Sequence, residues 1–223
     1  MLSKYDNKIE ELRGLITSLL QDIVTANQTS LSAFANDNID DYELVKEKLK
    51  RVESQGDEID NEIIKTFALF GPEAKELRSL VAYLKMNNEL VRIGTGVRKY
   101  ARRMKDSMQG ETSFEPLKPT IIQLHKSTVR ALELILECFT SLDECNIEDY
   151  YRKIMVEESK NDDIFSILEK DIMALIIDEK ELSPEYVKML GTIRKLERSC
   201  DRSVNIANLM MYAKNGGEIS LYS

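Results

Sequence analysis

Acidic side chains spaced four residues apart are the pattern in this sequence with the clearest chemical meaning. Glu53 and Asp57 form one pair, and Glu158 and Asp162 form a second pair 105 residues later. Residues four apart lie on the same face of a helix, so each pair would present two neighbouring carboxylates. Carboxylate oxygens from adjacent helices are ligands for hard or borderline divalent metals, as in the metal sites of helical bundles.

A third acidic pair, Glu197 and Asp201, lies in a segment that repeats an earlier one. In the earlier copy Val91 stands for Glu197 and Thr95 stands for Asp201, so that copy lacks both carboxylates. We therefore predict one metal site in the second half, formed by Glu158, Asp162, Glu197 and Asp201. The corresponding site at Glu53 and Asp57 is expected to be weak or empty. The alternative is that the pairs are solvated surface, because a chain with 39 acidic residues contains such pairs by chance.

The acidic pairs belong to an internal repeat. NIDDY at residues 38–42 recurs as NIEDY at residues 146–150, and each copy continues with a long helical pattern and a helix opened by proline. The matching ends are LVRIGTGVRKYARRM at 90–104 and LERSCDRSVNIANLM at 196–210. Because several matches recur in the same order, the sequence indicates two copies of one three-helix unit.

Apolar residues recur at three- and four-residue steps, which predicts amphipathic helices throughout. The expected helices are 4–35, 41–70, 72–108, 120–142, 147–178 and 184–214. The first is expected to bend or break at residues 27–30, and its buried stripe is Leu12, Leu15, Ile16, Leu19, Leu20 and Ile23. Ser183 is expected to cap the last helix and Gly216–Gly217 to end it.

The fold class predicted from this pattern is all-α, with two tandem three-helix bundles packed side by side. The first unit covers residues 1–110 and the second 120–217. A linker, 111–119, separates them, and a frayed tail, 218–223, follows.

Composition excludes several classes of function. A net charge of −8 argues against nucleic-acid binding, and the basic run 98–105 is read as a solvated helix face. The N-terminus has no apolar signal core, and no window approaches the ~20 apolar residues of a membrane span. The three cysteines are widely spaced, so no disulfide framework is expected and a reducing cytoplasm is inferred. Cys200 is read as a small buried apolar residue.

The repeated segments resemble the PhoU family, whose mark is a helical motif close to LERIGD followed by NIA. The residues that carry the resemblance are Leu196, Glu197, Arg198, Asp201, Asn205, Ile206 and Ala207, with Leu90, Arg92, Ile93 and Gly94 in the first copy. Asp57–Asp60 and Glu76–Arg78 resemble further family motifs. The chain departs from the pattern at Val91, Thr95, Ser199 and Cys200, and Phe165 stands where the first copy has Asp60.

The resemblance implies a cytoplasmic regulator of phosphate uptake and of phosphate-starvation signalling, often dimeric. It implies two partners, the phosphate-transporter ATPase subunit and the phosphate-sensing histidine kinase, and a membrane reached only through them. It also implies that the acidic motifs bind iron or zinc. The chain would act by docking and would need no catalytic residue.

Two other functions stay open at this stage. One is a metal-free helical adaptor for a different partner. The other is a carboxylate-bridged metalloenzyme, but such sites normally take histidines from Glu-x-x-His motifs. The single histidine, His125, lies in QLHKS and is read as an ordinary helix-face residue.

Overall fold

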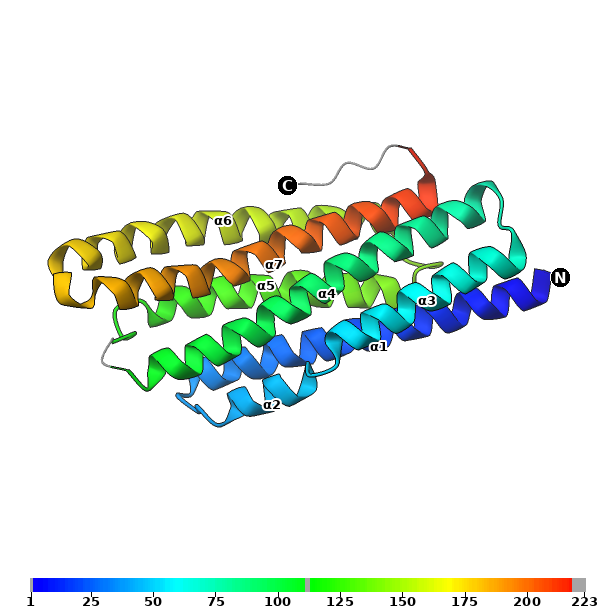
Figure 1. Cartoon of the computed structure of the whole chain (residues 1–223). Helices are drawn as coiled ribbons and strands as arrows, with labels where there is room; N and C mark the ends of the chain where they lie inside the picture. The colour runs from blue at the N-terminus through cyan, green and yellow to red at the C-terminus, as the bar shows by residue number, and fades with distance from the viewer. Residues whose placement is uncertain (1, 111–112, 218–223) are drawn as a thin grey trace.

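Long helices account for almost all of the chain (Figure 1). The computed structural model describes residues 2–110 and 113–217, so the predicted tail 218–223 and part of the linker lie outside it. Its elements are α1 (Leu2–Ala35), α2 (Asp41–Lys48), α3 (Val52–Phe70), α4 (Ala74–Met108), α5 (Lys118–Thr140), α6 (Ile147–Asp178), the short 3₁₀ helix η1 (Lys180–Leu182) and α7 (Ser183–Asn215).

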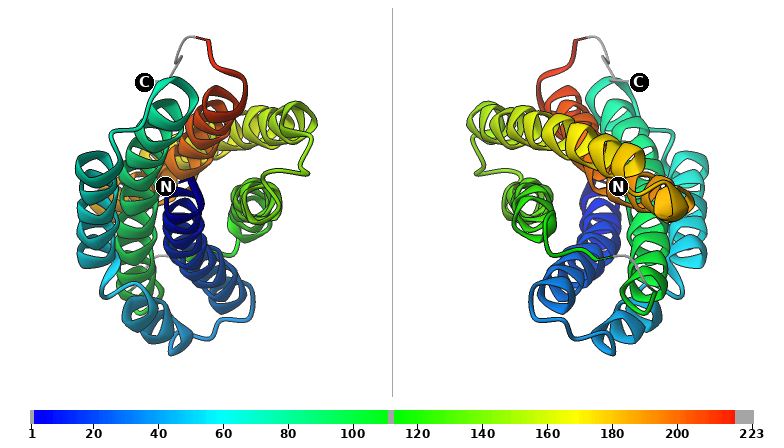
Figure 2. Two further views of the ribbon diagram at one scale, coloured as in Figure 1. Left: turned by 90° about the vertical axis from the view of Figure 1, so that its right-hand side faces the viewer. Right: turned by 90° about the vertical axis from the view of Figure 1, so that its left-hand side faces the viewer.

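The helices form two units that meet at α4 and α7. Figure 2 looks along the bundle and shows α1 to α4 on one side and α5 to α7 on the other. Helices α4 and α7 pack against each other along their length, and α1 also packs against α5. Buried apolar side chains from both units form one continuous core. The predicted all-α fold of two tandem three-helix bundles is confirmed.

Helix α1 is continuous, so the predicted break at residues 27–30 is wrong. Asn27 donates a side-chain hydrogen bond to the Ile23 carbonyl at 2.9 Å, and Thr29 does the same to Thr25 at 2.9 Å. Polar side chains that bond back to their own helix satisfy themselves without ending it. The predicted buried stripe is correct except for Leu15, which is 38% exposed.

The second predicted helix, 41–70, is instead divided into α2 and α3 at residues 49–51. The repeat itself explains the division. Eleven residues separate Tyr42 from Glu53, whereas eight separate their counterparts Tyr150 and Glu158 on the unbroken α6. The first unit therefore has three surplus residues at this point, and the break between α2 and α3 accommodates them.

Proline and glycine mark several of the helix ends. Gly71 ends α3 with φ 53°, a left-handed conformation that favours glycine, and Gly216 follows α7 with φ 80°. The expected start of a helix at Pro72 is wrong by two residues, because Glu73 is extended and α4 begins at Ala74. Helix α6 has the predicted bounds.

Ser183 does not cap α7 as predicted, because it is already the first residue of that helix. Its hydroxyl donates hydrogen bonds to the carbonyls of Ile176, at 3.1 Å, and Lys180, at 2.7 Å. A cap would accept a hydrogen bond from a backbone N–H. Ser183 therefore ties the turn between α6 and α7 together.

Cys138 and Cys145 form a disulfide, which corrects the expectation of no disulfide. Cys138 lies in the last turn of α5 and Cys145 lies just before α6. The chain reverses direction between them, and their Cα atoms are 5.4 Å apart, a normal disulfide separation. The inference of a reducing cytoplasm from the cysteines therefore loses its support. Cys200 is free and buried, as expected.

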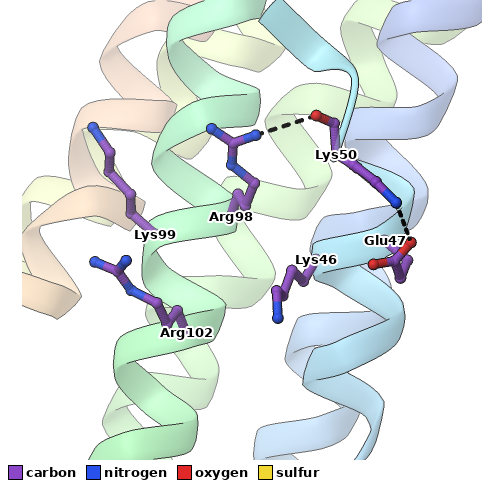
Figure 3. A pocket seen from close by; sticks show the side chains of 6 residues that line it. All are labelled: Lys46, Glu47, Lys50, Arg98, Lys99 and Arg102. Carbon is purple, nitrogen blue, oxygen red and sulfur yellow. Dashed lines mark hydrogen bonds and ion pairs between the residues drawn. The ribbon is translucent and has the colours of Figure 1, made fainter.

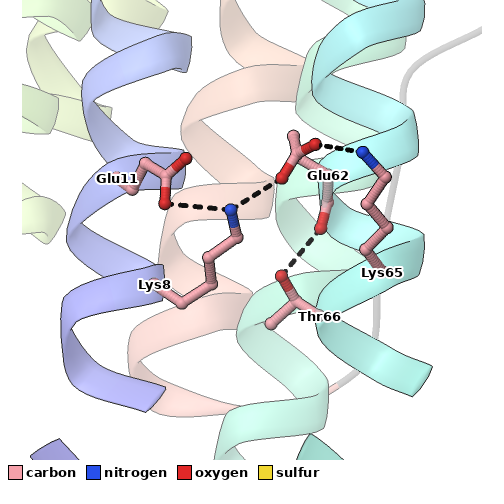
Figure 4. Close-up of polar contacts among 5 residues, drawn as sticks. All are labelled: Lys8, Glu11, Glu62, Lys65 and Thr66. Atoms are coloured by element: carbon pink, nitrogen blue, oxygen red, sulfur yellow. Dashed lines mark hydrogen bonds and ion pairs between the residues drawn. The ribbon is translucent and has the colours of Figure 1, made fainter. Parts of the chain in front are cut away.

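A polar cluster joins α1 to α3 near the N-terminus (Figure 4). The Glu62 carboxylate accepts hydrogen bonds from Lys8 at 2.6 Å and from Lys65 at 2.5 Å. These two hydrogen bonds hold the pKa of Glu62 at about 2. Lys8 also pairs with Glu11 at 2.9 Å, and Thr66 donates to the Glu62 carbonyl at 2.7 Å. The Lys8–Glu62 pair thus links α1 to α3.

None of the helices in the described residues is both long enough and apolar enough to cross a membrane.

Candidate metal centre

Three carboxylates of the second unit come together where α6 lies against α7. Glu158 and Asp162 project from α6 and Asp201 from α7. Each offers one carboxylate oxygen, and the three oxygens lie within 4.8 Å of one another. The structure thus brings together three of the four residues predicted for this site, from two helices.

Glu197, the fourth predicted residue, lies one turn before Asp201 on α7. Its Oε2 atom is buried and has no hydrogen-bond partner among the described residues. Burial, followed by the charges of Asp201 and Asp162, raises the pKa of Glu197 to about 7. Burial and the charge of Asp162 raise the pKa of Asp201 to about 6.

The pKa values of the two α6 carboxyl groups are raised as well. Burial and the charges of Asp162 and Asp201 raise the pKa of Glu158. Burial and the charge of Asp163 raise the pKa of Asp162. Each negative charge in the group therefore makes the others harder to form.

The group has no internal neutralising partner in the described part of the chain. Arg194 and Arg198 lie near enough to lower the pKa of Glu197 in part, but the Arg194 guanidinium is paired with Glu169 at 2.7 Å. An excess of carboxylates with a buried, unpaired oxygen fits a cation. Because the donors are all oxygens, the set suits a hard cation better than a soft one.

The first unit brings no such group together in the residues that the structure describes. Glu53 is paired with Arg98 at 3.0 Å. Asp57 is exposed, and Val91 and Thr95 supply no ligand from α4. The acidic pair of this unit therefore lies on a surface where one member already has a positive partner.

Two further residues of the first unit, Asn87 and Asp60, are hydrogen-bonded to each other. Asn87 donates a hydrogen bond to Asp60 at 2.6 Å and another to the Gly56 carbonyl at 2.8 Å. Gly56 lets α3 approach α4 closely, because a Cβ atom there would overlap the Val91 side chain. Helices α3 and α4 thus lie close enough to share a metal site, but Val91 and Thr95 are not metal ligands.

The model of the PhoU domain matches this chain twice, at residues 16–104 and 121–210. This chain belongs to the PhoU family. The phosphate-specific transport system accessory protein PhoU of Edwardsiella tarda is 26% identical over 94% of this chain and 81% of its own length. A PhoU homolog of Thermotoga maritima is 26% identical over 89% of this chain and 87% of its own.

Solved PhoU structures share the fold. The crystal structure of PhoU from Pseudomonas aeruginosa has a TM-score of 0.84 at 18% identity, covering 96% of this chain and 100% of that one. The phosphate transport system regulatory protein PhoU from Streptococcus pneumoniae has a TM-score of 0.77 at 22% identity, covering 97% and 100%. All four carboxylates of the candidate centre lie in the second PhoU domain.

Sequence analysis missed one residue that positions the centre. Asn161 lies on α6 between Glu158 and Asp162 and is fully buried. It donates hydrogen bonds to the Leu124 carbonyl, at 2.9 Å, and to two hydroxyls of α5, those of Ser127 and Thr128, at 2.7 and 3.0 Å. The repeat could have drawn attention to Asn161, because the equivalent position in the first copy is Gly56.

His125, read from the sequence as an ordinary helix-face residue, faces the core. It is fully buried on α5, in edge-to-face contact with Tyr100 of α4 at 5.3 Å between ring centroids. Neither ring nitrogen has a hydrogen-bond partner among the described residues, and burial lowers its pKa to about 3. It is not among the residues grouped at the candidate centre.

Proposed function

We propose that this protein is an accessory regulator of phosphate transport that acts by docking on partner proteins. The observation that carries the proposal is the pair of PhoU domains, which together extend over most of the chain. Relatives aligned along nearly its whole length are named as accessory proteins of the phosphate-specific transport system. A docking role needs no catalytic residue, so the protein would not be an enzyme.

The proposed partners are the transporter ATPase subunit and the phosphate-sensing histidine kinase, as the family resemblance implies. Exposed apolar side chains on helix surfaces, including Leu44, Leu69 and Ile177, give such docking some apolar area. Homodimer formation and a cytoplasmic location stay predictions.

We also propose that the second domain holds a metal ion between α6 and α7. Glu158, Asp162 and Asp201 would bind it, and the unpaired Glu197 oxygen is the additional donor. Iron is the first candidate, ahead of zinc, because the donors are oxygens without nitrogen or sulfur. A bound cation would offset the repulsion among these carboxylates and hold the two helices together.

The metal proposal has a matched control within the repeat. Asp162→Asn removes a donor of the second domain, and Asp57→Asn makes the same change at its first-domain counterpart. Protein purified without chelator or histidine tag is incubated with iron or zinc, and metal per chain is measured by mass spectrometry. We expect binding by wild type and by Asp57→Asn, with loss in Asp162→Asn. Equal metal content in the two variants would contradict the centre.

The regulatory proposal is tested separately by surface plasmon resonance with the purified ATPase subunit and kinase. We expect wild-type protein to bind at least one of them. Failure of folded, metal-loaded protein to bind either would contradict the docking role, whatever the metal content. If Asp162→Asn binds as well as wild type, docking does not require the metal.

A further inference from the structure

Cationic side chains line two adjoining hollows on α4 that share Lys99. The first, between α2 and α4, has a volume of about 370 Å³ and is shown in Figure 3. The second, between α4 and α7, has a volume of about 360 Å³. The cations of this α4/α7 hollow are Arg92, Lys99, Lys195, Arg198 and Arg202. This gathering of positive charge contrasts with the net charge of −8 of the whole chain.

In the first hollow most cations already have carboxylate partners. Lys46 pairs with Glu43 at 3.2 Å, and Lys50 pairs with Glu47 at 3.4 Å. Arg98 is also paired, with Glu53 of α3. Figure 3 shows Lys99 extending away from Lys46 and Lys50. Lys99 and Arg102 are therefore the cations of the first hollow that form no ion pair with the described residues.

The α4/α7 hollow is different. Arg92 and Arg202 share Glu89, at 3.9 and 2.5 Å. The side-chain nitrogens of Lys99, Lys195 and Arg198 form no hydrogen bond or ion pair with the described residues, and the ammonium of Lys195 lies near the positive charges of Lys99 and Arg198. Arg198 also lies near the Glu197 and Asp201 carboxylates. The three like charges nevertheless repel one another, so an anion placed among them would be attracted by all three.

The repeat places this hollow where the first domain lacks its metal centre. Val91 and Thr95, which replace Glu197 and Asp201, both line it, together with Glu53. Helix α7 contributes to both places, because on average its cations and its acidic pair point in directions roughly 110° apart around the helix axis. The first domain thus has neutral side chains where the second has Glu197 and Asp201, and cations from α4 and α7 lie beside them.

We propose that the α4/α7 hollow binds a phosphate group. Two lysines and an arginine without partners match the several negative charges and oxygens of a phosphate, and the arginine can donate two parallel hydrogen bonds to it. The small residues Gly96 and Ser199 form part of the wall, and the volume leaves room for a ligand larger than one phosphate group. The ligand would be a free polyphosphate or the phosphate of a lipid headgroup. The inference does not depend on the regulatory role.

Calorimetric titration with inorganic pyrophosphate at low salt tests the free ligand, and cosedimentation with vesicles of phosphatidic acid in phosphatidylcholine tests the lipid. Metal is first removed on a chelating resin, so that pyrophosphate cannot bind through an ion at the carboxylates. The test variant is Lys99→Gln/Lys195→Gln. The matched control, Lys126→Gln/Lys170→Gln, removes two exposed lysines from α5 and α6 and changes the net charge equally.

We expect the test variant to weaken binding at least about tenfold, the effect of losing charge-assisted hydrogen bonds, while the control binds like wild type. Such a loss with pyrophosphate assigns the site to a free phosphate compound, and a loss seen only with vesicles assigns it to a lipid headgroup. No binding of either probe at millimolar phosphate, or equal weakening in both variants, would overturn the proposal. Circular dichroism checks that each variant is folded.

Discussion

In the second domain, carboxylates that face one another across α6 and α7 repel one another when no cation is bound. This repulsion lowers the stability of the folded protein. Glu197 illustrates this cost, because its buried Oε2 has no partner and its pKa is raised to about 7. At neutral pH the folded, metal-free protein must either hold a proton there or accept the repulsion. The metal-free protein therefore carries a cost in stability here, which a bound cation would offset.

Neutralising Glu197 is expected to stabilise the metal-free protein. At pH 8, Glu197→Gln removes one of the repelling charges and should raise the free energy of unfolding by on the order of 1 kcal/mol. The folded pKa lies above the ordinary value of 4.5, so protonation stabilises wild type as pH falls, and this stability is lost as pH rises through about 7.

Urea unfolding of metal-stripped protein at pH 8 and at pH 5 measures this difference. The gain from Glu197→Gln should shrink at the lower pH, where the wild-type carboxyl already carries its proton. Glu115→Gln, an exposed control in the loop before α5, should change little. A loss of stability in Glu197→Gln at pH 8 would contradict the repulsion argument.

At this scale the sequence identified the carboxylates but not their neighbours. The four-residue spacing and the repeat predicted which acids share a face. They did not predict that Arg98 pairs with Glu53, since the two residues are 45 positions apart on different helices. The inward orientation of Asn161 also depends on how α5 packs against α6. Tertiary packing of this kind leaves no periodic signal in one helix.

At the scale of helices, continuity depends on small differences between the repeats. The bounds of helix α6 could be predicted closely, because Asn146 before it accepts a hydrogen bond from the Asp149 N–H and the apolar pattern has no interruption. The division between α2 and α3 was missed although the offset between the repeats changes by three residues there. An insertion inside an amphipathic pattern can preserve local periodicity, so periodicity alone did not reveal it.

The cluster at Glu62 is expected to give α3 a pH-dependent attachment to α1. Glu62→Gln should lower the free energy of unfolding at pH 7 by up to about 1 kcal/mol, because two partly exposed ion pairs are lost. The folded pKa of about 2 lies below the ordinary 4.5. The wild-type advantage is therefore complete above pH 4.5 and is lost as pH falls toward about 2.

Chemical unfolding at pH 7 and at pH 3 tests this attachment. Glu58→Gln is the control, because Glu58 pairs with Arg51 on the solvent side of α3, where both side chains are mostly exposed. We expect a smaller effect there. An undiminished difference between wild type and Glu62→Gln at the lower pH would show that the carboxylate charge is not responsible.

On the scale of the whole molecule, α4 and α7 unite the two domains. Glu89 on α4 is only 8% exposed, and its carboxylate accepts a hydrogen bond from Arg202 on α7 at 2.5 Å. The repeat predicted two matching units and the resemblance predicted their fold. Which residues join the units could not be predicted, because the contact is between the copies and not within either one.

Removing Arg202 alone should harm this junction more than removing both partners. Arg202→Met leaves the Glu89 carboxylate nearly buried with only the weaker contact from Arg92, which should cost about 2 kcal/mol. The double variant Glu89→Gln/Arg202→Met should recover part of that loss. A double-mutant cycle from thermal or urea unfolding measures the coupling, with the exposed pair Arg51 and Glu58 as the reference. Additive effects at Glu89 and Arg202 would contradict a specific junction.

The burial of His125 gives the molecule a spectroscopic reporter of its own. The chain has a single histidine, so its ring protons give one set of imidazole signals in a proton NMR spectrum without labelling. Because its pKa is about 3, the ring stays neutral across physiological pH and its chemical shift does not follow the buffer. The shift instead follows the ring current of Tyr100, which comes from the other domain. A ligand that moves one domain against the other would therefore move this one resonance.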